Sequence, residues 1–434
     1  MAVAVRAGPL GGGGNVITRV EIDGFKSFLN FELDVHPCTV LMGTNGSGKS
    51  NLLDALDFVR KAVTSGFPSS LGTDPPLAPR HLFHHAAGSD GTYSSTVMSI
   101  KVGMIVPSAD GPLPMVVWLE VERDTRPPES SRATPLPVRA SVWVSSMDRT
   151  GWMGRLGMPE ELKAALSEAR EKFLKRTGTD WVSLDAESAG AGRDGAELLA
   201  LLHRECATWQ PIALDPAALR RPFGGSEVAP LQADGGNLAA VLHRVGRDER
   251  SAMEADLAAL IPETDGIRPL FDERRGEYDF DVLFSHTGWT SPPMLSGGTL
   301  RVLALLAAWY DDRRAGVLAV EELENGLHPS RLPELVRRLL RGVDGYDDLT
   351  RRATQVSGFR QLIATTHSPA LLSALRDETS GGLVFLEPDS RVDADSHTVS
   401  TVTRARPVRE RRPGEDADAT VSVDEAIAQL GATA

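Results

Sequence analysis

The sequence predicts an α/β protein whose main sheet is assembled from two separated parts of the chain. Cys38–Met42 is a short, nearly continuous apolar run, and apolar residues over 51–63 recur at helical spacing. Strand–helix alternation pauses after the first 125 residues and resumes at about Glu277. The residues between have mostly helical patterns. We therefore expect one α/β domain, split in sequence by a mainly helical insertion.

Alternating apolar and polar residues at 16–22 and 28–35 predict two half-buried strands ahead of the apolar strand. After the helix, residues 65–80 are rich in Gly, Pro and Ser and predict a loop. Alternation at 96–106 and 114–121 indicates further strands. These strands and the first helix form the expected N-terminal lobe.

Helical patterns dominate the middle of the chain, at 159–176, 195–209, 237–245 and 250–261. Residues 404–420 are dense in charge and predict a disordered stretch before a short helix. The chain thus divides into five parts: a flexible N-terminal segment, an N-terminal lobe, a mainly helical insertion, a C-terminal lobe and a charged tail, at 1–15, 16–125, 126–275, 276–395 and 396–434.

Composition predicts a cytoplasmic protein. Two cysteines, Cys38 and Cys206, are too few for a disulfide-built fold and fit a reducing compartment. The longest apolar run, 302–310, is too short to cross a membrane, and the first fifteen residues lack the apolar core of a signal peptide. The net charge of −13 argues against wholesale binding of nucleic acid but leaves room for a local basic patch.

The segment GTNGSGKS at 43–50 matches the phosphate-binding pattern G-x-x-x-x-G-K-[ST], between a predicted strand and a predicted helix. Its glycines let successive backbone N–H groups point at phosphate oxygens, and the helix dipole adds positive charge. Lys49 would neutralise the β- and γ-phosphates, and the Ser50 hydroxyl would hold Mg²⁺. The residues expected to contact a nucleotide are Gly43, Asn45, Gly46, Gly48, Lys49, Ser50 and Asn51.

A second strand, in the segment VLAVEE at 317–322, ends in two carboxylates. After a phosphate-binding loop, such a pair is typical of a metal contact followed by a water-activating base. We expect Glu321 to bind the metal shell and Glu322 to orient and deprotonate the attacking water.

The segment MLSGGT at 294–299 precedes an apolar helix. Ser296 begins that helix, and Gly297 and Gly298 allow close approach of a phosphate, so the segment predicts another anion site. One γ-phosphate does not need two such sites from one subunit. The pattern therefore points to a composite site made by two chains.

A third apolar strand, in LIATTHS at 362–368, ends in His367. A polar residue at the end of a strand beside the phosphate-binding loop can reach the γ-phosphate. We therefore expect His367 to act in catalysis together with Lys49 and Glu322.

These four elements, in this order, resemble the ABC-class ATPase head, with its Walker A, signature, Walker B and switch-histidine motifs. GFKSF at 24–28 is similar to the opening of SMC- and RecF-type ATPases. ELENGLHP at 322–329 looks like the E-P-E-N-G-L-H-P segment of bacterial "predicted AAA ATPases" related to the OLD family. The resemblance extends over roughly 16–390.

The resemblance implies an ABC-type P-loop head with a helical lid, in which two heads sandwich two ATP molecules with Mg²⁺. Ser296 of one head would face the P-loop of the other, and Asn325 and Gly326 would cross the dimer interface. Relatives of this group act in DNA repair, chromosome maintenance and phage defence, often beside a separate nuclease.

Three positions depart from the family pattern. Glu321 stands where most ABC proteins have Asp, and Thr299 replaces the final Gln of the signature. No Gln occurs between Ser50 and Trp209, the window in which the family has its Q-loop glutamine. Two interpretations of the HLFHHAAG segment remain open: His84 or His85 substitutes for that glutamine, or both are ordinary loop residues.

The sequence thus predicts an ATPase that acts as a nucleotide-gated homodimeric switch and controls DNA or a partner nuclease. Two alternatives belong to other classes. The nucleotide-binding subunit of a transporter is disfavoured by the missing Q-loop glutamine and the SMC-like opening. A non-hydrolytic ATP sensor or scaffold has only the altered signature and Q-loop in its favour.

Overall fold

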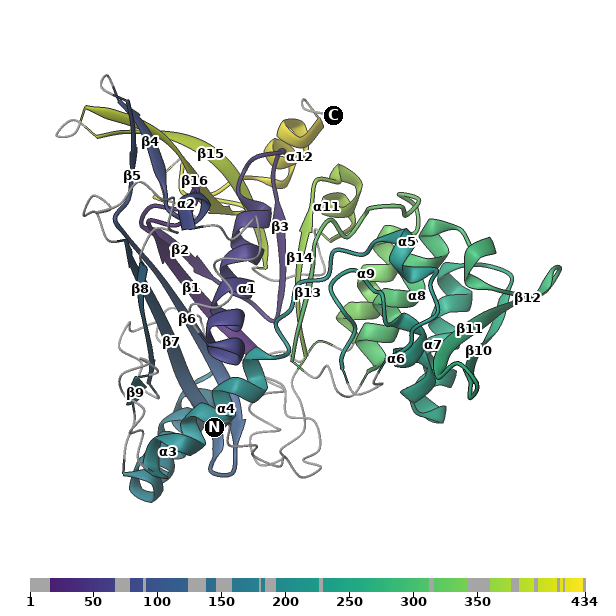
Figure 1. The fold of residues 1–434 in the computed structure, drawn as a ribbon. Coiled ribbons are helices and arrows are strands. Elements are labelled where there is room, and N and C mark those ends of the chain that lie inside the picture. Colours follow the sequence, from purple (N-terminus) through teal and green to yellow (C-terminus); the bar gives the residue numbers. More distant parts are fainter. Residues whose placement is uncertain are drawn as a thin grey trace, which may run out of the picture.

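The structure is a computed structural model. The residues that it describes are 16–66, 79–88, 91–123, 138–145, 158–178, 181–183, 193–225, 229–311, 316–341, 343, 360–375, 382–393, 397–411, 414–416 and 418–431. Within these ranges the chain forms three β-sheets with helices between and beside them (Figure 1). The expected flexible segment 1–15 lies outside the described residues.

The N-terminal lobe is built on an antiparallel sheet of six strands in the order β2-β1-β6-β7-β8-β9. These strands are β1 (Val16–Asp23), β2 (Phe31–Asp34), β6 (Val97–Ser108), β7 (Gly111–Arg123), β8 (Val138–Ser145) and β9 (Trp181–Ser183). The last two come from the range 126–275, so part of that range extends the N-terminal sheet. Two helices of the same range, α3 (Glu160–Thr177) and α4 (Arg193–Cys206), lie along this lobe (Figure 1).

A second sheet, of seven strands, has the order β13-β14-β3-β15-β16-β4-β5. Its members are β3 (Cys38–Met42), β4 (His85–Gly88), β5 (Gly91–Ser94), β13 (Gly316–Val320), β14 (Arg360–Thr366), β15 (Leu383–Asp393) and β16 (Thr398–Pro407). The first four strands in that order are mutually parallel. Their carboxyl ends therefore meet at one edge of the sheet, which is where such sheets bind ligands.

Helix α1 (Lys49–Ser65) is enclosed between the two sheets (Figure 1). Because side chains alternate along β3, Leu41 packs into the core that contains α1, whereas Val40 and Met42 pack into the core on the opposite face. A strand buried on both faces has mostly apolar residues, which explains the nearly continuous apolar run at Cys38–Met42.

On the opposite face of the parallel strands lies a second layer, made of helices and a small sheet (Figure 1). Its elements are α5 (Pro216–Leu219), α6 (Leu238–Arg244), α7 (Arg247–Leu260), β10 (Thr264–Asp272), β11 (Glu277–Phe284), β12 (Gly288–Thr290), α8 (Gly297–Tyr310), α9 (Leu332–Leu340) and α11 (Pro369–Leu375). Strands β10, β11 and β12 form the third, antiparallel sheet. No helix in the described ranges has the length and apolar character needed to cross a membrane.

The predicted disorder of residues 404–420 is wrong where the structure describes them. Thr398–Pro407 is β16, which pairs with β15 over its whole length, and helix α12 (Val423–Gly431) packs against α11. The reason is that β16 is rich in β-branched residues, which favour a sheet. Its charges are also paired: Arg406 contacts Glu387, and Arg409 contacts Glu415.

Candidate functional site

The phosphate-binding loop joins β3 to α1 through glycines that no other residue type can replace without strain. Gly43 and Gly48 have φ values of 155° and 100°. A Cβ on Gly48 would lie 2.9 Å from Thr403 Cγ2 and closer still to its Oγ1, so β16 packs directly on the loop. Gly48 also precedes α1 without a side-chain cap, which leaves the first-turn N–H groups available for an anion.

Lys49 is turned toward the loop that precedes it. Its Nζ donates hydrogen bonds to the carbonyl oxygens of Gly43, at 2.6 Å, and Thr44, at 2.8 Å. Burial lowers the pKa of Lys49, and the negative charge of nearby carboxylates acts in the opposite direction. Those carboxylates belong, in order of effect, to Glu324, Glu322 and Glu321. The lysine expected to meet phosphate thus lies within the field of the acids at the ends of β13.

Ser50 and Glu321, the two residues expected to hold Mg²⁺, are in contact. The Ser50 hydroxyl, on the first turn of α1, donates a hydrogen bond to Glu321 Oε1, directly after β13. Two oxygen ligands in contact fit Mg²⁺, which takes one or two protein oxygens and completes its shell with phosphate and water. Elsewhere in the described ranges no group of three or more His, Cys, Asp or Glu is arranged to hold a metal alone. Such an ion would therefore depend on the phosphates of a bound nucleotide.

Glu322 has a left-handed backbone, with φ 47°, which is unusual for a residue other than Gly. Its N–H donates to Thr365 Oγ1 at 2.8 Å, and its carboxylate accepts a hydrogen bond from the side-chain amide of Asn325. Strain of this kind costs about 1–3 kcal/mol and gathers at functional sites. The predicted base is therefore held in a fixed orientation by both β14 and the following turn.

His367 follows β14, whose last residue, Thr366, is in register with Met42 of β3. The ends of these adjacent strands bring His367 beside the start of the phosphate-binding loop. Its N–H and its ring Nδ1 both contact Glu324 Oε1, at 2.6 and 2.8 Å. The ring is 48% exposed, so one side remains open.

Ser296 is the N-cap residue of α8. Its Oγ accepts a hydrogen bond from Thr299 N at 3.0 Å. Among the described residues Ser296 makes no hydrogen bond to the loop 43–50 of its own chain. A Cβ on Gly298 would lie 2.5 Å from the Gly326 carbonyl oxygen, so the start of α8 packs against the turn that follows Glu322.

Sequence reasoning missed a hydrogen-bonded chain that fastens the GFKSF segment to the loop. Thr403 Oγ1 contacts Ser27 Oγ at 2.7 Å and donates to the Ser47 carbonyl oxygen at 3.0 Å. Asn51, expected to contact nucleotide, donates from its amide to Ser27 Oγ at 2.9 Å. GFKSF itself is a visible sequence signal. Thr403 is not, because its strand is hidden in a charge-dense stretch.

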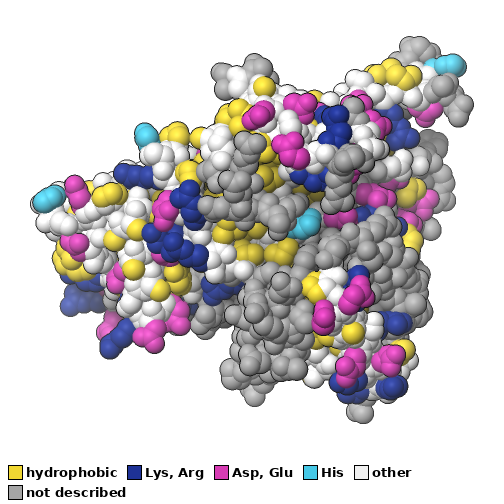
Figure 2. Space-filling model, turned by 180° about the vertical axis from the view of Figure 1, so that it is seen from behind, with side chains coloured by type: hydrophobic (Ala, Val, Ile, Leu, Met, Phe, Trp, Pro, Cys, Tyr) yellow, Lys and Arg dark blue, Asp and Glu magenta, His cyan; other side chains and the backbone are white. Residues whose placement is uncertain are grey.

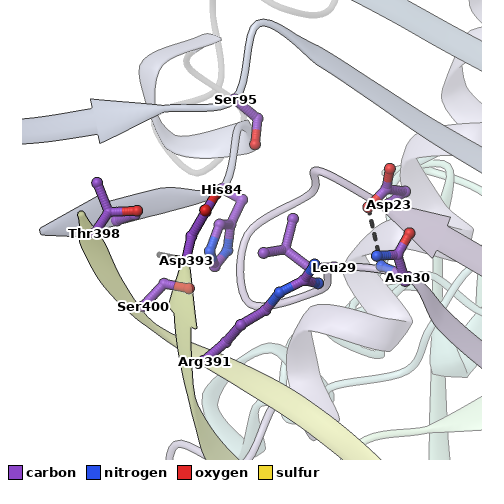
Figure 3. Close-up of a pocket in the computed structure, with 10 residues that line it drawn as sticks. Asp23, Leu29, Asn30, His84, Ser95, Arg391, Asp393, Thr398 and Ser400 are labelled. Atoms are coloured by element: carbon purple, nitrogen blue, oxygen red, sulfur yellow. Dashed lines mark hydrogen bonds between the residues drawn. The ribbon is translucent and has the colours of Figure 1, made fainter. Parts of the chain in front are cut away.

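His84 lies against the GFKSF segment. Its Nδ1 donates to the Lys26 carbonyl oxygen at 2.6 Å, and no hydrogen bond of its ring reaches the loop 43–50 within the described part of the chain. Burial lowers the pKa of His84, against the effect of that hydrogen bond. Figure 3 shows the ring beside Arg391 and Asp393, in a hollow of about 370 Å³. The geometry gives His84 a contact with Lys26 and none with the predicted phosphate site.

Arg301 links α8 to the acidic turn. It is 8% exposed, and Nη1 donates to the Leu214 carbonyl oxygen at 3.3 Å. Burial lowers its pKa, and the charges of Glu322 and Glu324 oppose that effect. Two cations, Lys49 and Arg301, thus lie within the field of the same carboxylates.

Two parts of the chain match models of known protein domains. Residues 196–373 match the family described as "AAA domain, putative AbiEii toxin, Type IV TA system", and residues 16–70 match "AAA ATPase domain". The two matches contain the loop 43–50, the signature segment, both glutamates and His367. No curated protein matches the sequence significantly.

One solved structure with a TM-score above 0.5 shows the fold, and two others are similar at lower scores. An SMC head bound to the C-winged helix domain of ScpA matches with a TM-score of 0.51 and 14% identity, over 90% of this chain and 98% of that one. The SMC head of Thermotoga maritima matches with a TM-score of 0.44 and 12% identity, over 91% of this chain and 99% of that one. An SMC head with coiled coil and joint from Pyrococcus yayanosii matches with a TM-score of 0.48 and 12% identity, over 96% of this chain and 99% of that one.

Two parts of the chain therefore match models of AAA-type ATPase domains, and the fold is similar to that of an SMC head.

Proposed function

We propose that the protein hydrolyses ATP and acts as a nucleotide-gated homodimeric switch in DNA repair or maintenance, or in phage defence. The observation that carries the proposal is the convergence of Lys49, Ser50, Glu321, Glu322 and His367 at the carboxyl ends of β3, β13 and β14. Together these residues supply a cation that can bind phosphate, two oxygen ligands for a metal ion, a general base and an imidazole ring at the same edge of the sheet.

In the proposed reaction a water oxygen attacks the γ-phosphorus of ATP, the bond to the bridging oxygen breaks, and ADP leaves. Glu322 accepts the proton of that water, and Asn325 holds its carboxylate in place. Lys49 offsets the negative charge of the β- and γ-phosphates. A Mg²⁺ ion held by Ser50 and Glu321 would neutralise charge on the same phosphate oxygens.

Dimer formation is proposed because the signature segment is presented outward. Ser296 is exposed at the start of α8 and makes no hydrogen bond to its own loop 43–50 in the described part of the chain. An N-capped helix start with two adjacent glycines binds an anion well. A partner protomer would bring its own γ-phosphate to this segment, so that ATP closes the dimer.

The test uses the purified full chain with Glu322→Gln, Lys49→Ala and, as a matched surface control, Glu334→Gln. We expect Glu322→Gln to lower turnover by about 10²–10⁴-fold while ATP still binds. Light scattering should then show an ATP-dependent species of about twice 46.6 kDa. Lys49→Ala should remove both turnover and dimer. Unchanged turnover in Glu322→Gln would refute the mechanism, and a monomer under all conditions would refute the gating.

The trigger is either DNA or a partner protein. Figure 2 shows acidic and basic side chains interspersed on the face opposite that of Figure 1, and the net charge is −13. We therefore expect duplex DNA to stimulate turnover less than about two-fold. Strong, salt-sensitive stimulation would instead identify DNA as the trigger and require a local basic surface.

A further inference from the structure

Glu324, in the turn after β13, is in direct contact with His367, which follows β14. One oxygen of Glu324 accepts from both the His367 backbone N–H, at 2.6 Å, and ring Nδ1, at 2.8 Å. The carboxylate is 12% exposed and the ring 48%. A double contact to backbone and ring fixes the position of the ring as well as its rotation.

The turn that carries Glu324 is fastened to the end of β14. Leu323 is buried and its N–H donates to the Thr365 carbonyl oxygen at 3.0 Å. The Leu327 N–H closes the turn by donating to the Glu324 carbonyl oxygen, also at 3.0 Å. Glu324 therefore has a fixed backbone from which to hold the histidine.

The Glu324 carboxylate lowers the stability of the fold in this position. Its second oxygen, Oε2, is buried and has no hydrogen-bond partner among the described residues. Lys49 and Arg301 both lie within its electric field. An incompletely bonded buried carboxylate is destabilising, so stability alone does not account for an acid at this position.

We propose that Glu324 is the positioning residue of His367. A carboxylate can only accept from Nδ1, so the proton of the neutral ring is on Nδ1 and Nε2 is the nitrogen presented on the open side. The same carboxylate balances the positive charge that the ring acquires when Nε2 also carries a proton and donates to a phosphate oxygen. Glu324 thereby decides which nitrogen faces the nucleotide.

This inference rests on the proposed function, because it assumes that His367 meets the γ-phosphate. Its first test does not depend on turnover. Selective ¹⁵N-histidine labelling of the full chain, with His367→Asn to assign the resonance, reports the ring tautomer at a pH where the ring is neutral. We expect Nδ1–H in the wild type and in Glu324→Gln, whose amide oxygen still accepts, and mainly Nε2–H in Glu324→Ala. An unchanged Nδ1–H tautomer in Glu324→Ala would overturn the proposal.

The second test separates positioning from a structural role. Glu324→Ala should lower kcat by about 10–100-fold with KM within about two-fold, and Glu324→Gln should recover most of kcat. In a His367→Asn background, Glu324→Ala should cost little more, because the two residues act as a unit. Equal losses in both backgrounds would reject the pairing. If the wild type has no turnover, the proposed function fails while the tautomer result still stands.

Discussion

Gly48, in the phosphate-binding loop, packs against Thr403 of β16. Its left-handed backbone and its contact with Thr403 exclude a side chain for two separate reasons. Gly66, at the end of α1, has φ 76°, but no atom of the described residues lies within 4 Å of the position of a Cβ. A side chain at Gly48 would cause both backbone strain and a steric clash, whereas one at Gly66 would cause backbone strain alone.

We expect Gly48→Ala to weaken ATP binding by at least about ten-fold, because the added methyl group must displace Thr403 and with it the loop. Gly66→Ala should cost only the strain of a backbone conformation that side chains rarely adopt, about 1–3 kcal/mol of stability, with ATP affinity unchanged. Fluorescent-nucleotide titration and urea unfolding measure the two quantities. Equal ATP affinity in Gly48→Ala and the wild type would show that the contact with β16 does not shape the loop.

At the scale of elements, how well a segment can be predicted depends on whether its signal is local. Cys38–Met42 is recovered to the residue, because a strand buried on both faces has an unbroken apolar run. The helix after it and the carboxylates after β13 follow from motif and position. Their meeting at one sheet edge then follows from parallel pairing.

Contacts between segments that are distant in sequence could not be predicted from local patterns. β16 runs into the charge-dense range 404–420, for which the sequence predicts disorder, and Thr403 stands just before that range with no motif of its own. The pairing of Glu324 with His367 joins two segments that are 43 residues apart, and neither segment carries a local mark of the other. Strands β8 and β9 likewise extend the first sheet from a range that has mainly helical patterns.

The reactivity of the two buried cysteines reports how often β3 and α4 open locally. Burial raises the pKa of Cys38, on β3, to about 12, and raises that of Cys206, at the end of α4, well above its usual value. Because the thiolate is the reactive form, both thiols should resist a disulfide reagent at pH 8 in the native protein and react at once in guanidinium. Asn45→Cys, at the exposed tip of the phosphate loop, provides a fast-reacting control that ATP should protect. Rapid native labelling of Cys38 would mean that β3 opens readily.

At the scale of the whole molecule, a bound nucleotide joins residues from both halves of the sequence. Lys49 and Ser50 come from the N-terminal lobe, whereas Glu321, Glu322 and His367 come from the C-terminal lobe. Any ligand that contacts both sets stabilises the assembled head as a unit.

ATP with Mg²⁺ should therefore raise the melting temperature, with a gain of about 2.7 kcal/mol at a ligand concentration one hundred times Kd. Removal of the metal by EDTA should reduce the gain, because the contact through Ser50 and Glu321 is lost. Lys49→Ala should abolish it. Differential scanning fluorimetry measures all three conditions, and an equal shift in Lys49→Ala would mean that ATP binds elsewhere.

The interleaved order of the sheet has a consequence for biosynthesis. Ile17 and Gln361 exchange two buried hydrogen bonds across 344 residues of sequence, and β3 acquires its neighbours β14 and β15 only from the far end of the chain. At typical elongation rates of about 5–20 residues per second, the ribosome needs roughly 20–70 s to make that connection. For that time the nascent phosphate loop lies on a strand with two open edges. The cell must shield these edges from aggregation until translation supplies the partners.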